Sequence, residues 1–238
     1  MIQLKKSIRE ISELIKDKFK KLIEGIKTGG VEYLLYAVGS RFPEWLFRYY
    51  HAYLIEADDL KIITRDYKDY EVRFATLDDI DNLKSVDINR EKACHRLERG
   101  DTCVIVVKDG RVVSISWAAT GRLYNRYAGS VVDTGDDGLF LYGVYIIPEE
   151  RMKGFFASCF KKQIEYYATQ NRTKKYGVVE ILNMASLKIH LRMGFKTTGE
   201  TFYVALAGMS ICYYKTWPKK TGKFHIFFRR PPNGLEWV

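Results

Sequence analysis

The chain has 238 residues, of which 47% are hydrophobic and 14% aromatic. This composition supports a sizeable core and excludes a disordered chain, a collagen-like chain and a disulfide-stapled mini-protein. Lysine and arginine number 39 against 29 acids, for a formal net charge of +10. We therefore expect an anionic partner: a phosphate-bearing cofactor, a membrane surface or nucleic acid.

No apolar run reaches the ~18 residues that a membrane-spanning helix needs. The first residues lack the apolar core and small-residue cleavage site of a signal peptide. The four cysteines form no CxxC pair, which favours reduced thiols. We therefore expect a cytoplasmic protein.

The first part of the chain predicts two helices. Apolar residues recur at three- and four-residue steps among lysines: Leu4, Ile8, Ile11, Leu14, Ile15, Leu22, Ile23 and Ile26. Gly29-Gly30 is expected to end this helix, and the aromatic stretch 31–53 predicts a second one. We expect residues 1–69 to be an N-terminal helical extension. It would pack on the main domain, pack on a second copy in a homodimer, or lie on the anionic inner face of a membrane.

From Tyr70 onward, strand and helix patterns alternate. The predicted strands are 70–74, 102–107, 112–119, 139–147, 176–182, 196–207 and 209–216; the predicted helices are 76–99, continuous or broken, 155–169 and 185–193, with a long loop at 121–137. This order predicts one α/β domain over residues 70–238, with a mixed sheet and helices on its faces.

One segment has the features of an anion-binding turn. The strand 139–147 runs into Pro148, then a short basic turn with Gly154, then a helix. Backbone N–H groups converge at a helix N-terminus, where the helix dipole favours negative charge. Gly154 would let a ligand approach the backbone closely, and Arg151 and Lys153 add positive charge. The alternative is an ordinary loop whose cations are solvated.

A second segment, 183–195, follows the strand 176–182, and together the two segments resemble the GNAT superfamily of acyl-CoA-dependent N-acyltransferases. That family has a P-x-x-R/Q-x-x-G-x-G/A turn after its fourth strand. Downstream it has an Asn after the fifth strand, a Tyr seven residues later, and Gly-Phe closing a short helix. The matching residues are Pro148, Arg151, Gly154, Asn183, Gly194 and Phe195. The resemblance covers residues 70–216 and implies a mixed, mostly antiparallel sheet with flanking helices.

The resemblance also implies a reaction and a binding site. Acetyl-CoA, or another acyl-CoA, would be the co-substrate, and an acetyl or longer acyl group would pass to a primary amine by direct attack in a ternary complex. The backbone of the fourth strand would pair with the pantetheine arm, and the turn would hold the pyrophosphate. The cofactor-binding residues would be Val144, Tyr145, Ile146, Arg151, Met152, Lys153, Gly154, Phe155, Phe156, Asn183 and Ser186.

Two positions depart from the family pattern. Phe156 stands where a Gly or Ala is usual, and His190 stands where the family has its Tyr. His190 could protonate the departing thiolate, or it could merely pack on its helix. Glu180 is the first candidate for the base that deprotonates the amine, with Tyr142 and the pair 136–137, both aspartates, behind it.

Other functions remain as alternatives. A catalytically weak CoA-binding or membrane-docking module is the main one. The tail 201–235 carries six cations, several aromatics and no acid, as single-stranded nucleic-acid binders can, but it has no nucleic-acid-binding motif, so we do not expect such a partner. The tail can equally be a last pair of strands with cationic outer faces, or a membrane-facing edge. The four histidines and four cysteines form no ligand cluster, and we expect no metal.

Overall fold

The structure is a computed structural model that describes residues 2–39, 41–43, 46–65, 67–86, 88–125, 130–207, 209–216, 221–228 and 236–237. Its helices are α1 (Ile2–Gly39), η1 (Leu77–Asp79), η2 (Asn82–Val86), α2 (Arg90–Glu98), η3 (Pro148–Glu150), α3 (Phe155–Ala168) and α4 (Met184–Met193). Its strands are β1 (Phe47–Ala57), β2 (Glu71–Phe74), β3 (Thr102–Lys108), β4 (Arg111–Ala119), β5 (Arg122–Asn125), β6 (Ser130–Asp133), β7 (Gly138–Ile146), β8 (Lys174–Glu180), β9 (Lys196–Leu206), β10 (Met209–Thr216), β11 (Thr221–Phe228) and β12 (Glu236–Trp237).

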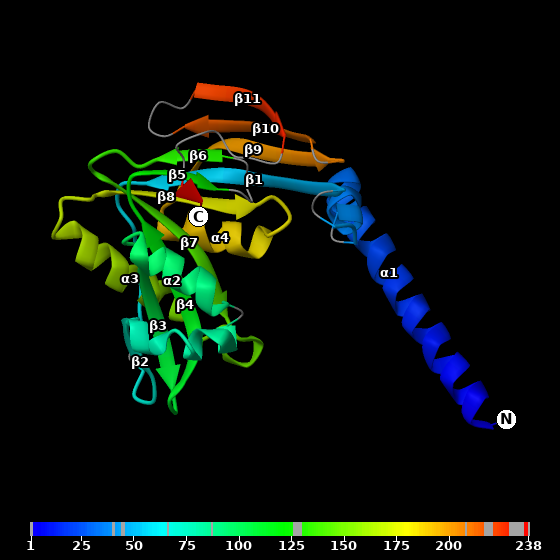
Figure 1. Ribbon diagram of the computed structural model, residues 1–238. Coiled ribbons are helices and arrows are strands. Elements are labelled where there is room, and N and C mark those ends of the chain that lie inside the picture. The colour runs from blue at the N-terminus through cyan, green and yellow to red at the C-terminus, as the bar shows by residue number, and fades with distance from the viewer. Residues whose placement is uncertain are drawn as a thin grey trace.

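A mixed, mostly antiparallel sheet with flanking helices organises the fold, as predicted (Figure 1). In the described residues it has nine strands in the order β11-β10-β9-β1-β8-β7-β4-β3-β2. Strands β7 and β8 pair in parallel, whereas the other neighbouring strands of this sheet pair antiparallel. The short helix-linked crossover from β7 to β8 explains that parallel pair, because parallel neighbours need such a connection.

The two faces of the sheet carry different elements. Ser116 of β4 donates a hydrogen bond to Gln163 of α3, so this side of β4 faces α3. The next residue, Trp117, points to the opposite face because side chains alternate along a strand, and it contacts Arg96 of α2 there. Helix α3 therefore covers one face, and α2 covers the other.

The N-terminal helix α1 extends away from the body of the molecule (Figure 1). Gly30 has non-helical backbone angles (φ 58°, ψ −143°), yet the chain resumes a helix beyond it, so the glycines kink the helix rather than end it. Several of its apolar side chains are exposed, among them Ile23, Val31 and Leu34. What covers them, a membrane or a second copy of the chain, stays a prediction. Among the described residues, no helix is both long enough and apolar enough to cross a membrane.

The second predicted helix is wrong over residues 47–53, because β1 occupies Phe47–Ala57. Burial alternates along β1, which pairs with β8 on one side and β9 on the other. The aromatic and β-branched residues here fit a half-buried strand better than a helix. The sheet thus includes residues from before position 70. The division into an extension at 1–69 and a domain at 70–238 remains a prediction about folding units.

One further expectation needs correction, and the structure decides two that the sequence left open. The predicted loop 121–137 contains β5 and β6, which pair with each other and, through β5, with β12. The predicted helix 76–99 is divided into η1, η2 and α2. Thr76 and Asp79 form a capping box around a short 3₁₀ turn, which ends before a longer helix can form. The aromatic, basic tail includes β11, paired with β10, while its residues 217–220 and 229–235 lie outside the described residues.

Candidate functional site

The gap between β7 and β8 is the centre of the candidate site. The two strands pair at three positions, from Gly138 opposite Lys174 to Phe140 opposite Tyr176. Beyond Phe140 they diverge, although β7 continues to Ile146 and β8 to Glu180. The backbone of 144–146, predicted to pair with pantetheine, therefore has β4 on one edge and the gap on the other.

A β-bulge at Gly143 lies at the point where the strands diverge. Ile115 of β4 pairs with Tyr145, but Trp117, two residues on, pairs with Tyr142, so β7 has one extra residue here. Gly143 adopts φ +58°, a conformation that glycine tolerates without strain. An isolated glycine within an apolar strand is a sequence signal for such a bulge, and our sequence analysis missed it.

The predicted anion-binding turn forms directly after β7. Gly154 is the N-cap of the 14-residue helix α3, with φ +93°, and Met152 also has a positive φ, of 67°. A Cβ at position 154 would come within 3.0 Å of the Tyr67 hydroxyl oxygen. The N–H groups of Ala157 and Ser158 donate to the Gly154 carbonyl, so those of Phe155 and Phe156 are the ones that the helix N-terminus leaves for an anion at this turn.

Residues that the sequence did not single out hold this turn in place. The Tyr67 hydroxyl donates to the Lys153 carbonyl at 2.6 Å, and the Tyr70 hydroxyl donates to Glu150 at 2.8 Å. Lys153 and Lys108 form ion pairs with Glu150. The hydrogen bond from Lys153, followed by those from Tyr70 and Lys108, lowers the pKa of Glu150 to about 2. Glu150 supplies one negative charge to two lysines, so the charge of Lys153 is only partly compensated within the protein.

Arg151 is the more accessible predicted cation of the turn. Its side chain is exposed, and its Nε donates to the Ile146 carbonyl at 3.3 Å. Phe155 is fully buried, and its ring packs 4.9 Å from that of Tyr67. A side chain buried in this way anchors the helix, so the main chain of Phe155, rather than its ring, faces the turn.

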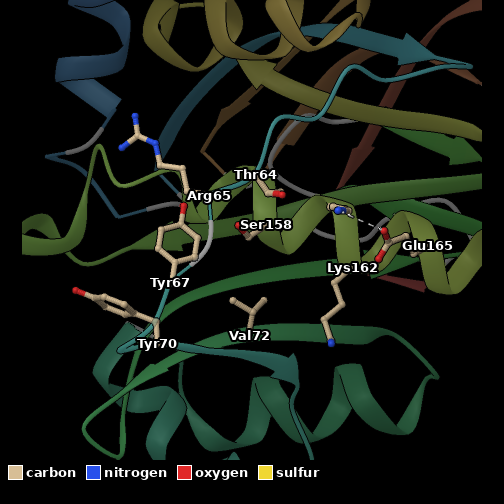
Figure 2. A pocket seen from close by; sticks show the side chains of 9 residues that line it. Thr64, Arg65, Tyr67, Tyr70, Val72, Ser158, Lys162 and Glu165 are labelled. Carbon is tan, nitrogen blue, oxygen red and sulfur yellow. Dashed lines mark ion pairs between the residues drawn. The ribbon is translucent and has the colours of Figure 1, made fainter.

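A cavity of about 330 Å³ lies between α3 and the segment that connects β1 to β2 (Figure 2). Its lining residues are Thr64, Arg65, Tyr67, Tyr70, Val72, Ser158, Lys161, Lys162 and Glu165. Three cations stand against one carboxylate, and Glu165 is paired with Lys161 at 3.8 Å. Tyr67 belongs both to this cavity and to the turn, so the two adjoin at this residue.

The structure brings together the two positions that depart from the family pattern. The Phe156 ring lies 5.0 Å from the His190 ring, edge to face, and His190 also contacts Phe160 and Phe195. His190 is 8% exposed, and burial lowers its pKa. Its Nδ1 lies 2.8 Å from the Ser186 carbonyl oxygen. A carbonyl only accepts, so the ring proton sits on Nδ1, and the neutral ring has no N–H at Nε2.

Asn183 and Ser186 begin helix α4 on the same edge of the sheet. The Asn183 side chain accepts a hydrogen bond from the Ser186 N–H at 3.1 Å, which makes Asn183 the N-cap. Because β7 and β8 are parallel, α4 and α3 both start at the carboxyl ends of these strands. The predicted cofactor-binding residues thus gather around the gap from two helix N-termini.

Glu180 ends β8 beside the gap. It is half-buried, and burial raises its pKa, with Arg48 acting in the opposite direction. Glu180 lines a small pocket together with Tyr36 of α1 and Tyr50 of β1. Its position at the carboxyl end of β8 places it at the same edge of the sheet as the turn.

The other predicted bases are held elsewhere. The Tyr142 hydroxyl donates to Asp101 and accepts from Arg99, and burial raises its pKa well above 10. The phenol therefore keeps its proton at neutral pH. Asp137 is paired with Lys174 at 2.8 Å, at the start of β7 and so at the opposite end of the strand from the turn. Asp136, its neighbour, is exposed there too.

Comparison with known proteins finds distant structural likenesses only. Neither a family model nor a curated protein matches the sequence. A protein from Novosphingobium aromaticivorans, assigned to the GNAT acetyltransferase family, aligns with a TM-score of 0.48 and 16% identity over 65% of this chain and 63% of its own.

Two other structures align at similar levels. They are a Trypanosoma brucei acetyltransferase (TM-score 0.43, 16% identity) and an aminoglycoside N-acetyltransferase in complex with CoA (TM-score 0.43, 17% identity). They align over 55% and 54% of this chain, and over 95% and 93% of their own. The chain covers less than two thirds of the length of the Novosphingobium protein. Among the described residues, no group of three or more histidine, cysteine or acidic side chains could hold a metal ion.

Proposed function

We propose that the chain is an acyl-CoA-dependent N-acyltransferase that transfers an acetyl or longer acyl group to a primary amine. The divergence of β7 and β8 directly before the N-terminus of α3 carries this proposal. It leaves a strand edge at 144–146 for an extended amide-containing arm, and it leads to a basic turn for a pyrophosphate. The cationic cavity next to the turn (Figure 2) suits the remaining phosphorylated part of CoA.

The chemistry needs two functions from the protein. Backbone N–H groups of β7 near the bulge would polarise the thioester carbonyl as negative charge develops on its oxygen. Glu180 would accept the proton of the attacking amine, directly or through one water, and its raised pKa brings it closer to neutral pH. The nitrogen then bonds to the acyl carbon, the carbon–sulfur bond breaks, and the thiolate takes a proton from solvent.

Binding of CoA to the turn is tested by thermal unfolding. At 100 times its dissociation constant, CoA should stabilise the folded protein by about 2.7 kcal/mol. For a chain of this size that raises the Tm by roughly 5 to 10 °C. Gly154→Asp places a Cβ and a carboxylate at the turn, next to Tyr67, and should abolish the shift.

Gly110→Asp is the matched control. Gly110 also has a positive φ, of 74°, but lies in the hairpin between β3 and β4 with open space around it. The strain of the substitution is therefore similar, and the CoA-induced shift should survive. A shift that persists in Gly154→Asp would place the phosphate site elsewhere.

Turnover separates the enzyme from its main alternative, a catalytically weak CoA-binding module. Acetyl-CoA is incubated with a panel of primary amines, and release of free thiol is followed. Amine-dependent thiol release supports the proposed transfer. Binding of CoA without release from any amine would favour the binding module.

A further inference from the structure

The first part of helix α1 stands away from the rest of the fold. Near its kink the helix contacts the sheet: a Cβ at Gly29 would come within 3.0 Å of the Leu182 side chain, and His51 Nδ1 of β1 lies 2.9 Å from a Glu32 carboxylate oxygen. Before this contact the helix extends outward from the body (Figure 1). About seven turns of helix therefore precede the contact with the sheet.

The spacing of residues on this part of α1 defines a broad apolar face. A helix turns by about 100° per residue, so the apolar positions fall within about half of its circumference. They are Leu4, Ile8, Ile11, Leu14, Ile15, Phe19, Leu22, Ile23 and Ile26. Where the face approaches the body, Ile23 and Ile26 are 47% and 37% exposed. A face this wide is typical of a helix that lies against an extended apolar medium.

The charged residues of the same segment are segregated by sign. The acids form a strip about 60° wide, directly opposite the apolar face: Glu10, Glu13, Asp17 and Glu24. All the cations except Lys6 lie to either side of that strip, toward the apolar face: Lys5, Arg9, Lys16, Lys18, Lys20, Lys21 and Lys27. Long basic side chains in such flanking positions can lay their stems along apolar surface and keep their charges in a polar layer.

We propose that residues 2–28 of α1 dock the protein on an anionic lipid surface. The apolar face enters the boundary between headgroups and acyl chains, the flanking cations meet the lipid phosphates, and the acidic strip faces water. The charge pattern carries the inference, because it places every acid of the segment as far as the helix allows from an anionic surface. The docking goes beyond the proposed function and does not depend on it.

A second copy of the chain fits this face less well than lipid does. A coiled coil needs apolar residues at alternating steps of three and four along one seam. The seam through Ile8, Ile11 and Ile15 next meets Lys18 and later Gly25, so it is interrupted after about two heptads. Cations flank the apolar face on both sides, so the lysines of two paired helices would face each other and repel. Lipid phosphates instead attract them.

Cosedimentation with vesicles tests the docking on the full chain. Wild type should bind vesicles of phosphatidylcholine and phosphatidylglycerol, bind pure phosphatidylcholine more weakly, and lose most of its binding at about 1 M salt, where charges are screened within ~3 Å. The double variant Ile8→Ser/Ile15→Ser should weaken binding by about 10-fold or more. Serine and isoleucine have similar helix propensities, so the helix persists. Ile63→Ser, at an 88% exposed isoleucine outside the helix, is the matched control and should bind like wild type.

Two lysine variants separate docking by this face from general charge attraction. Lys16→Glu and Lys6→Glu change the net charge equally, but Lys16 lies beside the apolar face and Lys6 lies among the acids. Each charge near an anionic surface changes binding by about fivefold, so Lys16→Glu should weaken binding by about 25-fold. Lys6 is about 10 Å farther from the lipid, roughly one screening length, so Lys6→Glu should weaken binding by at most about fivefold. Equal losses in the two variants would overturn the proposal.

Sedimentation equilibrium without lipid decides between lipid and a second copy. If wild type binds no anionic vesicles and forms a dimer that Ile8→Ser/Ile15→Ser dissociates, the apolar face belongs to a second copy and the proposal is wrong. Vesicle binding that the double variant leaves unchanged would also overturn it, because another surface would then be the lipid contact. None of these measurements uses acyl transfer, so the docking and the proposed function can each be refuted separately.

Discussion

Leu54 of β1 tests whether the N-terminal part of the chain belongs to the folded core. It is 0% exposed and packs with Leu123, Val132, Phe140 and Tyr176. Leu54→Ala removes three side-chain carbons from this cluster and leaves a cavity. A buried Leu→Ala change costs about 2 to 5 kcal/mol of folding stability, and a central strand has little freedom to collapse into the cavity that the substitution leaves.

For a chain of this size, each kcal/mol lowers the Tm by roughly 2 to 4 °C, so Leu54→Ala should lower it by about 10 °C. The measurement is thermal unfolding followed by circular dichroism. Ile63→Ala, at an 88% exposed position in the segment after β1, is the control and should change stability by less than about 0.5 kcal/mol.

Truncation extends the same test. Removing residues 1–28 leaves β1 in place, and the remaining chain should unfold cooperatively. Removing residues 1–57 deletes β1, the strand between β8 and β9. The free energy that its buried side chains and its strand pairing contribute exceeds the roughly 5–15 kcal/mol that is a typical total free energy of unfolding. The fragment should not fold. A fragment 70–238 with a cooperative transition near the wild-type Tm would refute this reasoning and support the division at residue 70.

The remaining predictions concern individual side chains of the site. Glu180→Gln should lower kcat by about 10²-fold or more and remove the acidic limb of the pH–rate profile, because the base with a raised pKa is gone; an unchanged limb would assign the base elsewhere. His190→Phe should keep kcat within about threefold, since the ring has no N–H at Nε2 to donate. The lowered pKa of His190 means that its contribution to stability is present above pH ~6.5 and is lost as the pH falls. The Tm of His190→Phe should therefore fall less than that of wild type between pH 7 and 5. A large fall in the kcat of His190→Phe would instead show a catalytic role.

The local features of the site could be predicted from the sequence alone. The apolar strand before Pro148, the glycine at 154 and the helical spacing after it are properties of neighbouring residues, so they specified the turn and α3. The same applies to α4, whose Asn183 cap and closing Gly194 lie at its two ends. These signals work because capping, periodicity and positive φ depend on a few consecutive residues.

Tertiary structure decided the features that depend on distant partners. The stretch 47–57 is compatible with either a helix or a strand by composition; pairing with β8 and β9, more than 100 residues away, made it a strand. The environment of His190 came from Phe156 of another helix. Arg96 and Trp117 carry no local motif, and only the packing of α2 on β4 places their side chains together. Burial and pairing are summed over the whole fold, so no window of consecutive residues contains them.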